Sequence, residues 1–493
     1  MRGPPGLPGL DPAELRAFVH TAWHDDALPA LQEYTRIECL SPAFAPDWEQ
    51  QGALARAAHL LGDWVRACPL PGLQAEVVAP PGRTPLLLVD VPGTAGPAGA
   101  GDGPAVLVYG HLDKQPPQGQ WRPGLGPYEP VLQGDRLYGR GTADDGYSVF
   151  AALVALQALA AAGVSAPRVM VLIEASEESG SPDLGAYLRD LQPRLGTPEL
   201  VVCLDSGCLT YDRLWLTTSL RGNLVLTLRV DVLTEGVHSG MAGGIVPSSF
   251  RILRQLLSRV EDERTAQILP PFLHAEVPEP ARRELASVAE SLGDAADHPF
   301  PTVPGLRLEG TSVADRLTRN AWGPALAVTG MDGIPATRDA GNVLRPCTTA
   351  KISLRLPPTV DATSAAGDLV QLLTADPPAG ARVTVTTETP ADGWVAPDPA
   401  PWVRDALDRG SRQSFGAPPG SLGEGGTIPF MPALSRRFPD TQFVATGVLG
   451  PGSNAHGPNE FLHLPMAEAV TCAVAHLVAA AGASPARGAT GSH

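Results

Sequence analysis

The chain has 493 residues, a formal net charge of −16 at pH 7, 43% hydrophobic residues and 18% charged residues. This length exceeds one ordinary hydrophobic core, so two or three domains are expected, and the apolar content excludes a disordered chain. The acidic balance argues against nucleic acid and anionic membrane surfaces as partners, because both carry negative charge. We therefore predict no nucleic-acid partner and no membrane partner.

The cysteines and the N-terminal residues bear on the cellular compartment. The six cysteines are scattered and form no CxxC pair, which is typical of reduced cysteines in a cytoplasmic protein. The first residues, MRGPPGLPGLDPAEL, contain neither an apolar signal core nor a cleavage motif. An apolar segment at 149–164 is short and is interrupted by Gln157, so it indicates a buried crossover helix. We expect a soluble, cytoplasmic protein.

Helical and strand patterns alternate over the first 215 residues. The expected helices are 12–33, 47–67 and one from about 148, and the expected strands are 85–91, 105–110, RVMVLIEA and ELVVCLD. Nearly continuous apolar strands separated by helices favour an α/β fold with a mostly parallel sheet, flanked by helices on both faces. In such sheets ligands bind beyond the carboxyl ends of the strands.

The pattern changes after about residue 214 and returns near 394. An alternating strand at 223–232 is followed by a helix at 248–261 and then by a charged, proline-containing stretch. Two further strands, 343–356 and 381–388, flank a helix at 361–374. This spacing indicates a small α+β sandwich. We therefore predict one discontinuous domain, 1–217 and 393–493, interrupted by an inserted domain at 218–392.

Residues able to bind metal follow several of the predicted strands. His111 and Asp113 follow VLVYG, and side chains two residues apart in an extended segment point to the same side. Asp113 would then accept a hydrogen bond from the far nitrogen of His111, as carboxylates do beside metal-bound histidines. The alternative is a strand-end histidine capped by its neighbour, without metal.

Two acidic pairs add candidate ligands. In GRGTADDG two adjacent acids, Asp144 and Asp145, precede a helix, and one such carboxylate can bridge two metals about 3.5–4 Å apart. The alternative is a helix N-cap, for which Asp144 or Asp145 is equally suited. Glu177 and Glu178 follow an apolar strand. The two glutamates are either a solvated loop or a metal ligand beside a general base.

Asp205 in CLDSG and His456 in SNAHGPNE complete the set. Each is a weak indication alone, and His456 by itself would be read as a loop histidine. Together with His111, Asp144 and Glu178 they form two imidazoles and three carboxylates, which suit two zinc ions at about 2.0–2.2 Å. Manganese or cobalt would accept the same ligands.

At the level of whole motifs, the chain resembles a known family. The segments HLDKQPP, GRGTADDG, EESGS, LRGN, VHSGMAGG, GEGGTIP and AHGPNE resemble the zinc aminoacylase/carboxypeptidase metallopeptidase family. That family includes carnosinase-type dipeptidases, succinyl-diaminopimelate desuccinylase and carboxypeptidase G. The resemblance spans about residues 20–480 and is strongest to the dipeptidase branch. It implies a di-zinc catalytic domain with an inserted lid and dimerisation domain.

The resemblance implies a role for each metal-type residue. By it, His111 and Asp205 hold one zinc, Glu178 and His456 hold the other, and Asp144 bridges both. Glu177 would be the general base, and Asp113 would orient a ligand.

The resemblance also implies residues that bind substrate. His238 in VHSGMAGG would reach the active site of a partner subunit, and Asn342 and Arg355 would grip the substrate. Arg355 suits a two-pronged pair with a carboxylate; alone, it would be read as a strand-face arginine in a surface ion pair. Gly426 and Thr427 match a loop that contacts the carboxyl end of the substrate.

The chain departs from the family pattern in two places. The family often reads DDKG where this chain has Asp145, Gly146 and Tyr147, so the local loop and helix start are expected to differ. A histidine that lines the substrate site of carnosinase-like enzymes has no counterpart near 388–392, ETPAD. Specificity for carnosine-like substrates is therefore not expected.

Together these features predict a homodimeric, metal-dependent amide hydrolase. Dipeptides with a free carboxylate are the expected substrates. An N-acyl-amino-acid deacylase or a carboxypeptidase of the same family is the first alternative. A dimeric scaffold without catalysis is the second alternative. Against it, every predicted metal ligand and the predicted base are present in the sequence.

Overall fold

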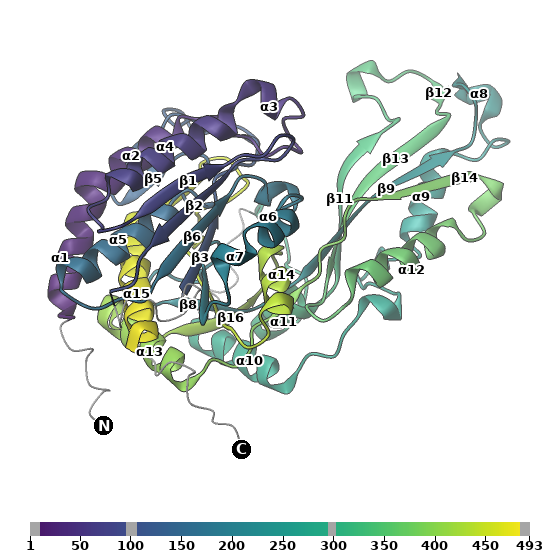
Figure 1. Ribbon diagram of the computed structural model, residues 1–493. Coiled ribbons are helices and arrows are strands. Elements are labelled where there is room, and N and C mark those ends of the chain that lie inside the picture. Colours follow the sequence, from purple (N-terminus) through teal and green to yellow (C-terminus); the bar gives the residue numbers. More distant parts are fainter. Residues whose placement is uncertain (1–9, 95–105, 294–301, 484–493) are drawn as a thin grey trace.

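The computed structural model describes residues 10–94, 106–293 and 302–483. Figure 1 shows a body built around one large sheet and an arm that carries a second, smaller sheet. The body contains the N-terminal and C-terminal parts of the chain and, at its lower edge, α10 and α11, and the arm contains the rest of the middle part.

The sheet of the body has six strands in the order β1-β2-β6-β3-β7-β17. Their bounds are β1 Gln74–Val78, β2 Leu86–Val91, β3 Val106–His111, β6 Val169–Glu174, β7 Leu200–Cys203 and β17 Gln442–Ala445. The strands β6, β3, β7 and β17 are parallel, as predicted. The strand expected at 85–91 is β2, which instead runs antiparallel to β6 and pairs with the antiparallel edge strand β1. Residue 105, the first of another expected strand, lies outside the described ranges.

Helices cover both faces of this sheet. One face packs mainly on α1 (Pro12–Ala22), α4 (Ala53–Ala67), α5 (Ser148–Ala161) and α15 (Leu464–Ala483), and the other on α6 (Leu184–Asp190) and α14 (Phe430–Arg437). In β2, Leu87 and Val89 belong to the first core and Leu86 and Leu88 to the second. This alternation follows from the two-residue period of a strand.

The apolar helices of the body are core helices. Every residue of α5 from Ser148 to Leu159 is buried, as expected for a crossover helix at 149–164. The longest apolar helix is instead α15, which the sequence pattern did not single out. By length and composition α15 is the one described helix able to cross a membrane, but 83% of its most apolar window is buried inside the protein.

The arm contains a four-stranded antiparallel sheet in the order β11-β13-β9-β14. Its strands are β9 Gly222–Asp231, β11 Ala325–Asp332, β13 Cys347–Leu356 and β14 Arg382–Thr387, and α9 (Ser249–Leu257) and α12 (Ala362–Thr374) pack on it. The edge strand β11 was not predicted. Its residues are mostly exposed, so it has no regular apolar alternation to identify it.

Part of the segment 218–392 packs on the body. Helices α10 (Glu279–Leu292) and α11 (Val313–Trp322) contact β16 (Gly420–Glu424). β16 in turn pairs with β8 (Trp215–Leu220), which also pairs with β15 (Trp394–Val395). Helices α10 and α11, which belong to the segment predicted as the inserted domain, therefore share a small core with the body.

Candidate active site and metal centre

The first group of metal-type residues lies at the carboxyl ends of β3 and β7. His111 is the last residue of β3 and is fully buried. Its Nε2 lies 3.3 Å from Oδ1 of Asp144 and 3.9 Å from Oδ2 of Asp205. The structure therefore brings together His111, Asp144 and Asp205, the three residues that the family resemblance implies for one ion.

The second group shares Asp144 with the first. Nε2 of His456 lies 3.1 Å from Oδ2 of Asp144 and 3.3 Å from Oε2 of Glu178. The two oxygens of Asp144 thus point to different histidines, as a bridging carboxylate requires. The side chains of Asp144 and Glu178 are 7% and 5% exposed, but that of His456 is 56% exposed. The site therefore opens to solvent on the side of His456.

The chemistry of these groups fits divalent cations. Oε1 of Glu178 is buried and has no hydrogen-bond partner among the described residues. Burial is the largest effect on Asp205 and raises its pKa to about 7. The charge of His111 opposes this rise, and the negative charge of Asp144 adds to it. Burial and then the charge of Asp205 raise the pKa of Glu177 well above its usual value. Such a buried excess of carboxylates is stabilised by positive ions.

Asp113 contacts His111 differently from the prediction. Nδ1 of His111 lies 3.0 Å from the backbone oxygen of Asp113 and 3.5 Å from its carboxylate Oδ1. The carboxylate oxygens instead accept hydrogen bonds from the backbone N–H groups of Glu177 and Glu178, at 3.1 and 3.0 Å. Asp113 therefore fixes His111 mainly through its backbone, and its side chain holds the short helical turn η2 (Glu177–Ser179).

Glu460 and Arg140 support the site and were not predicted. Oε1 of Glu460 accepts hydrogen bonds from the backbone N–H groups of Gly141, Ala143 and Asp144. Its other oxygen pairs with the buried Arg140 at 2.6 Å. Glu460 thus ties the loop that carries Asp144 to the loop that carries His456. Arg140 lies in the motif GRGTADDG and Glu460 in the motif AHGPNE. Their position inside these motifs was the sequence signal that could have identified them.

The departure at Gly146 and Tyr147 fits the local packing. A Cβ atom at position 146 would lie 2.3 Å from the ring of Tyr34 and 2.4 Å from the oxygen of Gly141, so a side chain here requires a different loop. The hydroxyl of the buried Tyr147 donates to the backbone oxygen of Leu204, at 2.5 Å. Tyr147 therefore braces the residue before Asp205.

Arg355 and Thr427 lie beside the metal-type residues of the same chain. Nη1 of Arg355 donates to the hydroxyl of Thr427 at 2.8 Å, and that hydroxyl donates to the backbone oxygen of Arg221. Burial lowers the pKa of Arg355, and the nearby charge of Glu177 opposes this effect. No carboxylate in the described ranges forms an ion pair with Arg355. Gly426 has open space where a Cβ would be.

His238 and Asn342 lie elsewhere in this chain. His238 ends β10 (Val237–His238), which pairs with β12 (Val343–Leu344) near α8 (Ser239–Ala242) at the outer end of the arm. The backbone oxygen of Asn342 accepts from Ser239 there, at 2.9 Å. Arg355 stands at the other end of β13, which at ten residues is roughly 30 Å long. Within one chain Asn342 and Arg355 therefore lie toward opposite ends of β13, and their shared role in binding substrate stays a prediction.

The chain is similar to a known peptidase family and to characterised dipeptidases. The model of peptidase family M20/M25/M40 matches residues 107–480. A cysteinylglycine-S-conjugate dipeptidase of Corynebacterium striatum is 30% identical over 382 residues, which cover 75% of this chain and 80% of that protein. A Beta-Ala-His dipeptidase of Rattus norvegicus is 29% identical over 264 residues, or 52% of each protein.

Solved structures show the same fold. Human carnosine dipeptidase 1 superposes with a TM-score of 0.80 at 20% identity, covering 98% of this chain and 100% of that chain. The dipeptidase Dug1p of Saccharomyces cerevisiae gives 0.78 at 19% identity, covering 96% and 99%. The predicted family resemblance and fold class are confirmed. The chain belongs to peptidase family M20/M25/M40 and is a metallopeptidase.

Proposed function

We propose that this protein is a di-zinc dipeptidase that hydrolyses the amide bond of small peptides with a free carboxylate. The observation that carries this proposal is the pair of ligand groups joined by Asp144. His111 and Asp205 would hold one ion, Glu178 and His456 the other, and Asp144 both. Manganese or cobalt in place of zinc remains compatible with these ligands.

Glu177 is assigned as the general base. Bound divalent ions would polarise the scissile carbonyl and lower the pKa of a water molecule to about 7. Glu177 is next to the ligand Glu178, and its backbone is held by Asp113. In this position Glu177 accepts a proton from the attacking water and then returns it to the leaving amine.

Arg355 and Thr427 are assigned to the substrate carboxylate. A buried guanidinium without a carboxylate partner is costly, so a substrate anion would satisfy the free donors of Arg355 and form a strong two-pronged pair. The loop of Gly426 and Thr427 adds a hydroxyl at the same place.

We further propose that the active unit is a homodimer. Met241 and Ile245, beside His238, are 79% and 81% exposed, and Met331, Ile334 and Val343 of the arm are also exposed. Clustered exposed apolar side chains of this kind support a protein–protein interface. Through it, His238 of the partner subunit would polarise the scissile carbonyl, and Asn342 of the partner subunit would contact the substrate.

A cytoplasmic location is also proposed. The six cysteines are all unpaired, and five of them are buried, which is compatible with a reducing compartment. Compartment fractionation of the producing cells, with detection of the native chain, tests this location.

A substrate panel with metal-loaded protein tests the proposed function. Dipeptides, including cysteinylglycine S-conjugates and β-alanylhistidine, are compared with N-acyl amino acids and with C-terminally amidated dipeptides. We expect turnover of free dipeptides, slow turnover of the amidated forms, and poor turnover of β-alanylhistidine. Equal rates for free and amidated dipeptides would contradict the carboxylate assignment, and preferred cleavage of N-acyl amino acids would favour a deacylase.

The variant Glu177→Gln sharpens the same test. It should lower kcat by about 10²–10⁴-fold, the usual contribution of a general base, with the metal content unchanged. Wild-type turnover in this variant would show that Glu177 is not the base.

A further inference from the structure

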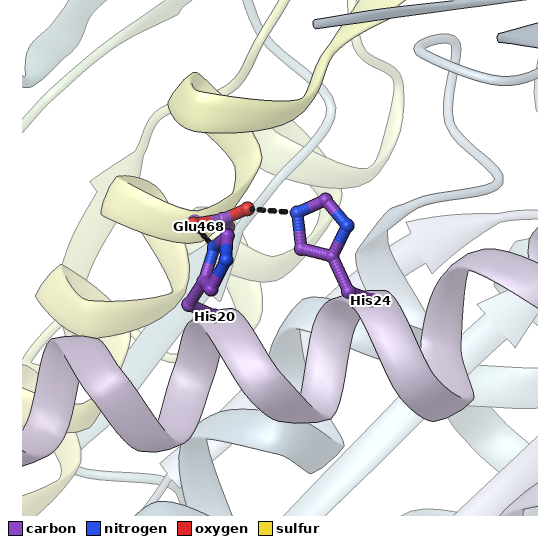
Figure 2. A group of neighbouring side chains, drawn as sticks. All are labelled: His20, His24 and Glu468. Atoms are coloured by element: carbon purple, nitrogen blue, oxygen red, sulfur yellow. Dashed lines mark hydrogen bonds and ion pairs between the residues drawn. The ribbon is translucent and has the colours of Figure 1, made fainter.

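A third cluster of metal-type side chains lies on the surface, where α1 packs on α15. His20 of α1 and His24 of the following π-helical turn η1 (Trp23–Ala27) converge on Glu468 of α15, as Figure 2 shows. Nδ1 of His20 lies 3.0 Å from Oε2 of Glu468, and Nε2 of His24 lies 3.1 Å from Oε1. We propose that this cluster binds one divalent transition-metal ion, such as Zn²⁺, separately from the active site.

The ligand geometry resembles that of the two active-site groups. The three candidate ligand atoms lie within 4.8 Å of one another, as they do in the other two groups. Ligands in tetrahedral zinc sites, with bonds of about 2.0–2.2 Å, lie roughly 3.3 Å apart. The nitrogen–oxygen distances therefore need to open by only a few tenths of an ångström. Two histidines and one glutamate leave a fourth position for water.

The helices hold the three side chains in place before any ion binds. Trp23 lies between the two histidines in sequence, and its Nε1 donates to the hydroxyl of Thr471 at 2.9 Å in the core. Thr471 is three residues after Glu468 on α15. This buried bond fixes the register of the two helices directly beneath the cluster, so ion binding requires little rearrangement of the backbone.

The two histidines are four residues apart, so their side chains lie on the same face of the helix. Their imidazole rings have centroids 4.3 Å apart, and both rings contact Glu468.

Two surface ion pairs are the alternative explanation. The side chains of His20, His24 and Glu468 are 63%, 40% and 20% exposed, and exposed pairs contribute little to stability. In that case two protonated imidazoles would share the single negative charge of Glu468, so one positive charge would have no partner in the cluster. A divalent ion would instead bind both imidazole nitrogens and the carboxylate, and so would satisfy all three side chains together.

Metal stoichiometry of the full-length protein tests the proposal. Wild type, His20→Ala/His24→Ala and Glu468→Gln are stripped with a chelator, equilibrated with low-micromolar free Zn²⁺ and measured by elemental analysis. His59→Ala, which removes an exposed histidine from α4, is the matched control. We expect the double variant to bind one equivalent less than wild type, Glu468→Gln to bind this equivalent more weakly, and the control to match wild type.

Activity and thermal unfolding distinguish this site from the active site. The double variant should keep wild-type peptidase activity when metal is saturating, but its melting temperature should rise less with Zn²⁺ than that of wild type, because an ion bound to the folded state alone stabilises it. Equal zinc content in wild type and double variant, or a loss of activity together with the lost equivalent, would overturn the proposal. Failure of the peptidase assignment would not affect this measurement, because it compares ion content between variants.

Discussion

The two places that carry the predicted chemistry differ in how complete they are within one chain. At the edge of the six-stranded sheet, His111, Asp144, Glu178 and Asp205 are almost completely buried and converge with His456 on a common centre. At the outer end of the arm, His238 is exposed, and Met241 beside it is 79% exposed. The sheet edge therefore brings a candidate ligand set together within one chain, whereas His238 lies away from it at the outer end of the arm.

The sheet edge is tested most strongly at Asp144. Asp144→Asn removes a charge from both ligand groups at once, so both ions should bind weakly and kcat should fall by at least about 10³-fold, because metal activation contributes several kcal/mol. Kinetics and elemental analysis are measured together. Asp63→Asn, on the exposed surface of α4, is the control. Retention of full metal content and activity would show that Asp144 does not bridge the ions.

The arm is tested by mixing two inactive variants. His238→Ala should lower kcat by about 10²–10³-fold, as does loss of one group that stabilises developing oxyanion charge. If His238 serves the partner subunit, co-refolded His238→Ala and Glu177→Gln chains form a mixed dimer with one intact site. The mixture should then recover about a quarter of wild-type activity, given random pairing of a symmetric dimer. No recovery in a confirmed mixed dimer would place His238 outside the partner's site.

Arg355 connects the two regions. It lies on β13 of the arm sheet, but its side chain lies close to Glu177 at the edge of the body sheet. Arg355→Lys keeps the charge but loses the two-pronged geometry, so kcat/KM for a free dipeptide should fall by about 10–100-fold, the cost of a lost charged hydrogen bond of about 1.5–3 kcal/mol. The amidated dipeptide should lose much less. A matched fall for both substrates would show that Arg355 has another role.

The smallest expected effect is at Tyr147, whose hydroxyl holds the backbone next to Asp205 at the sheet edge. Tyr147→Phe removes the hydrogen bond to the backbone oxygen of Leu204, and the free energy of unfolding should fall by about 1 kcal/mol. Urea unfolding of the metal-free protein measures this change. Tyr211→Phe, whose hydroxyl makes a longer, exposed bond, should change stability less. An unchanged stability for Tyr147→Phe would show that this bond contributes nothing net.

Much of the site was predictable because its signals are local. His111, Glu177, Glu178 and Asp205 each follow an apolar strand, and parallel strands place such residues at one sheet edge. Asp144 and His456 were predicted from the motifs GRGTADDG and AHGPNE. The periodicity of the strands alone does not place these two residues at the same site. The edge strand β11 was missed because its exposed residues carry no alternation, and α15 was overlooked although it is the longest apolar helix.

The sequence by itself determined the family, the fold class and the identity of the residues able to bind metal, because these depend on residue type and short-range order. Only the tertiary structure decided which of these residues meet. It turned the carboxylate of Asp113 toward the turn of Glu177, separated Arg355 from Asn342, and brought His20 and His24 to Glu468 from the other end of the chain. Contacts between residues hundreds of positions apart follow from how helices pack on the sheet, and no local pattern encodes them.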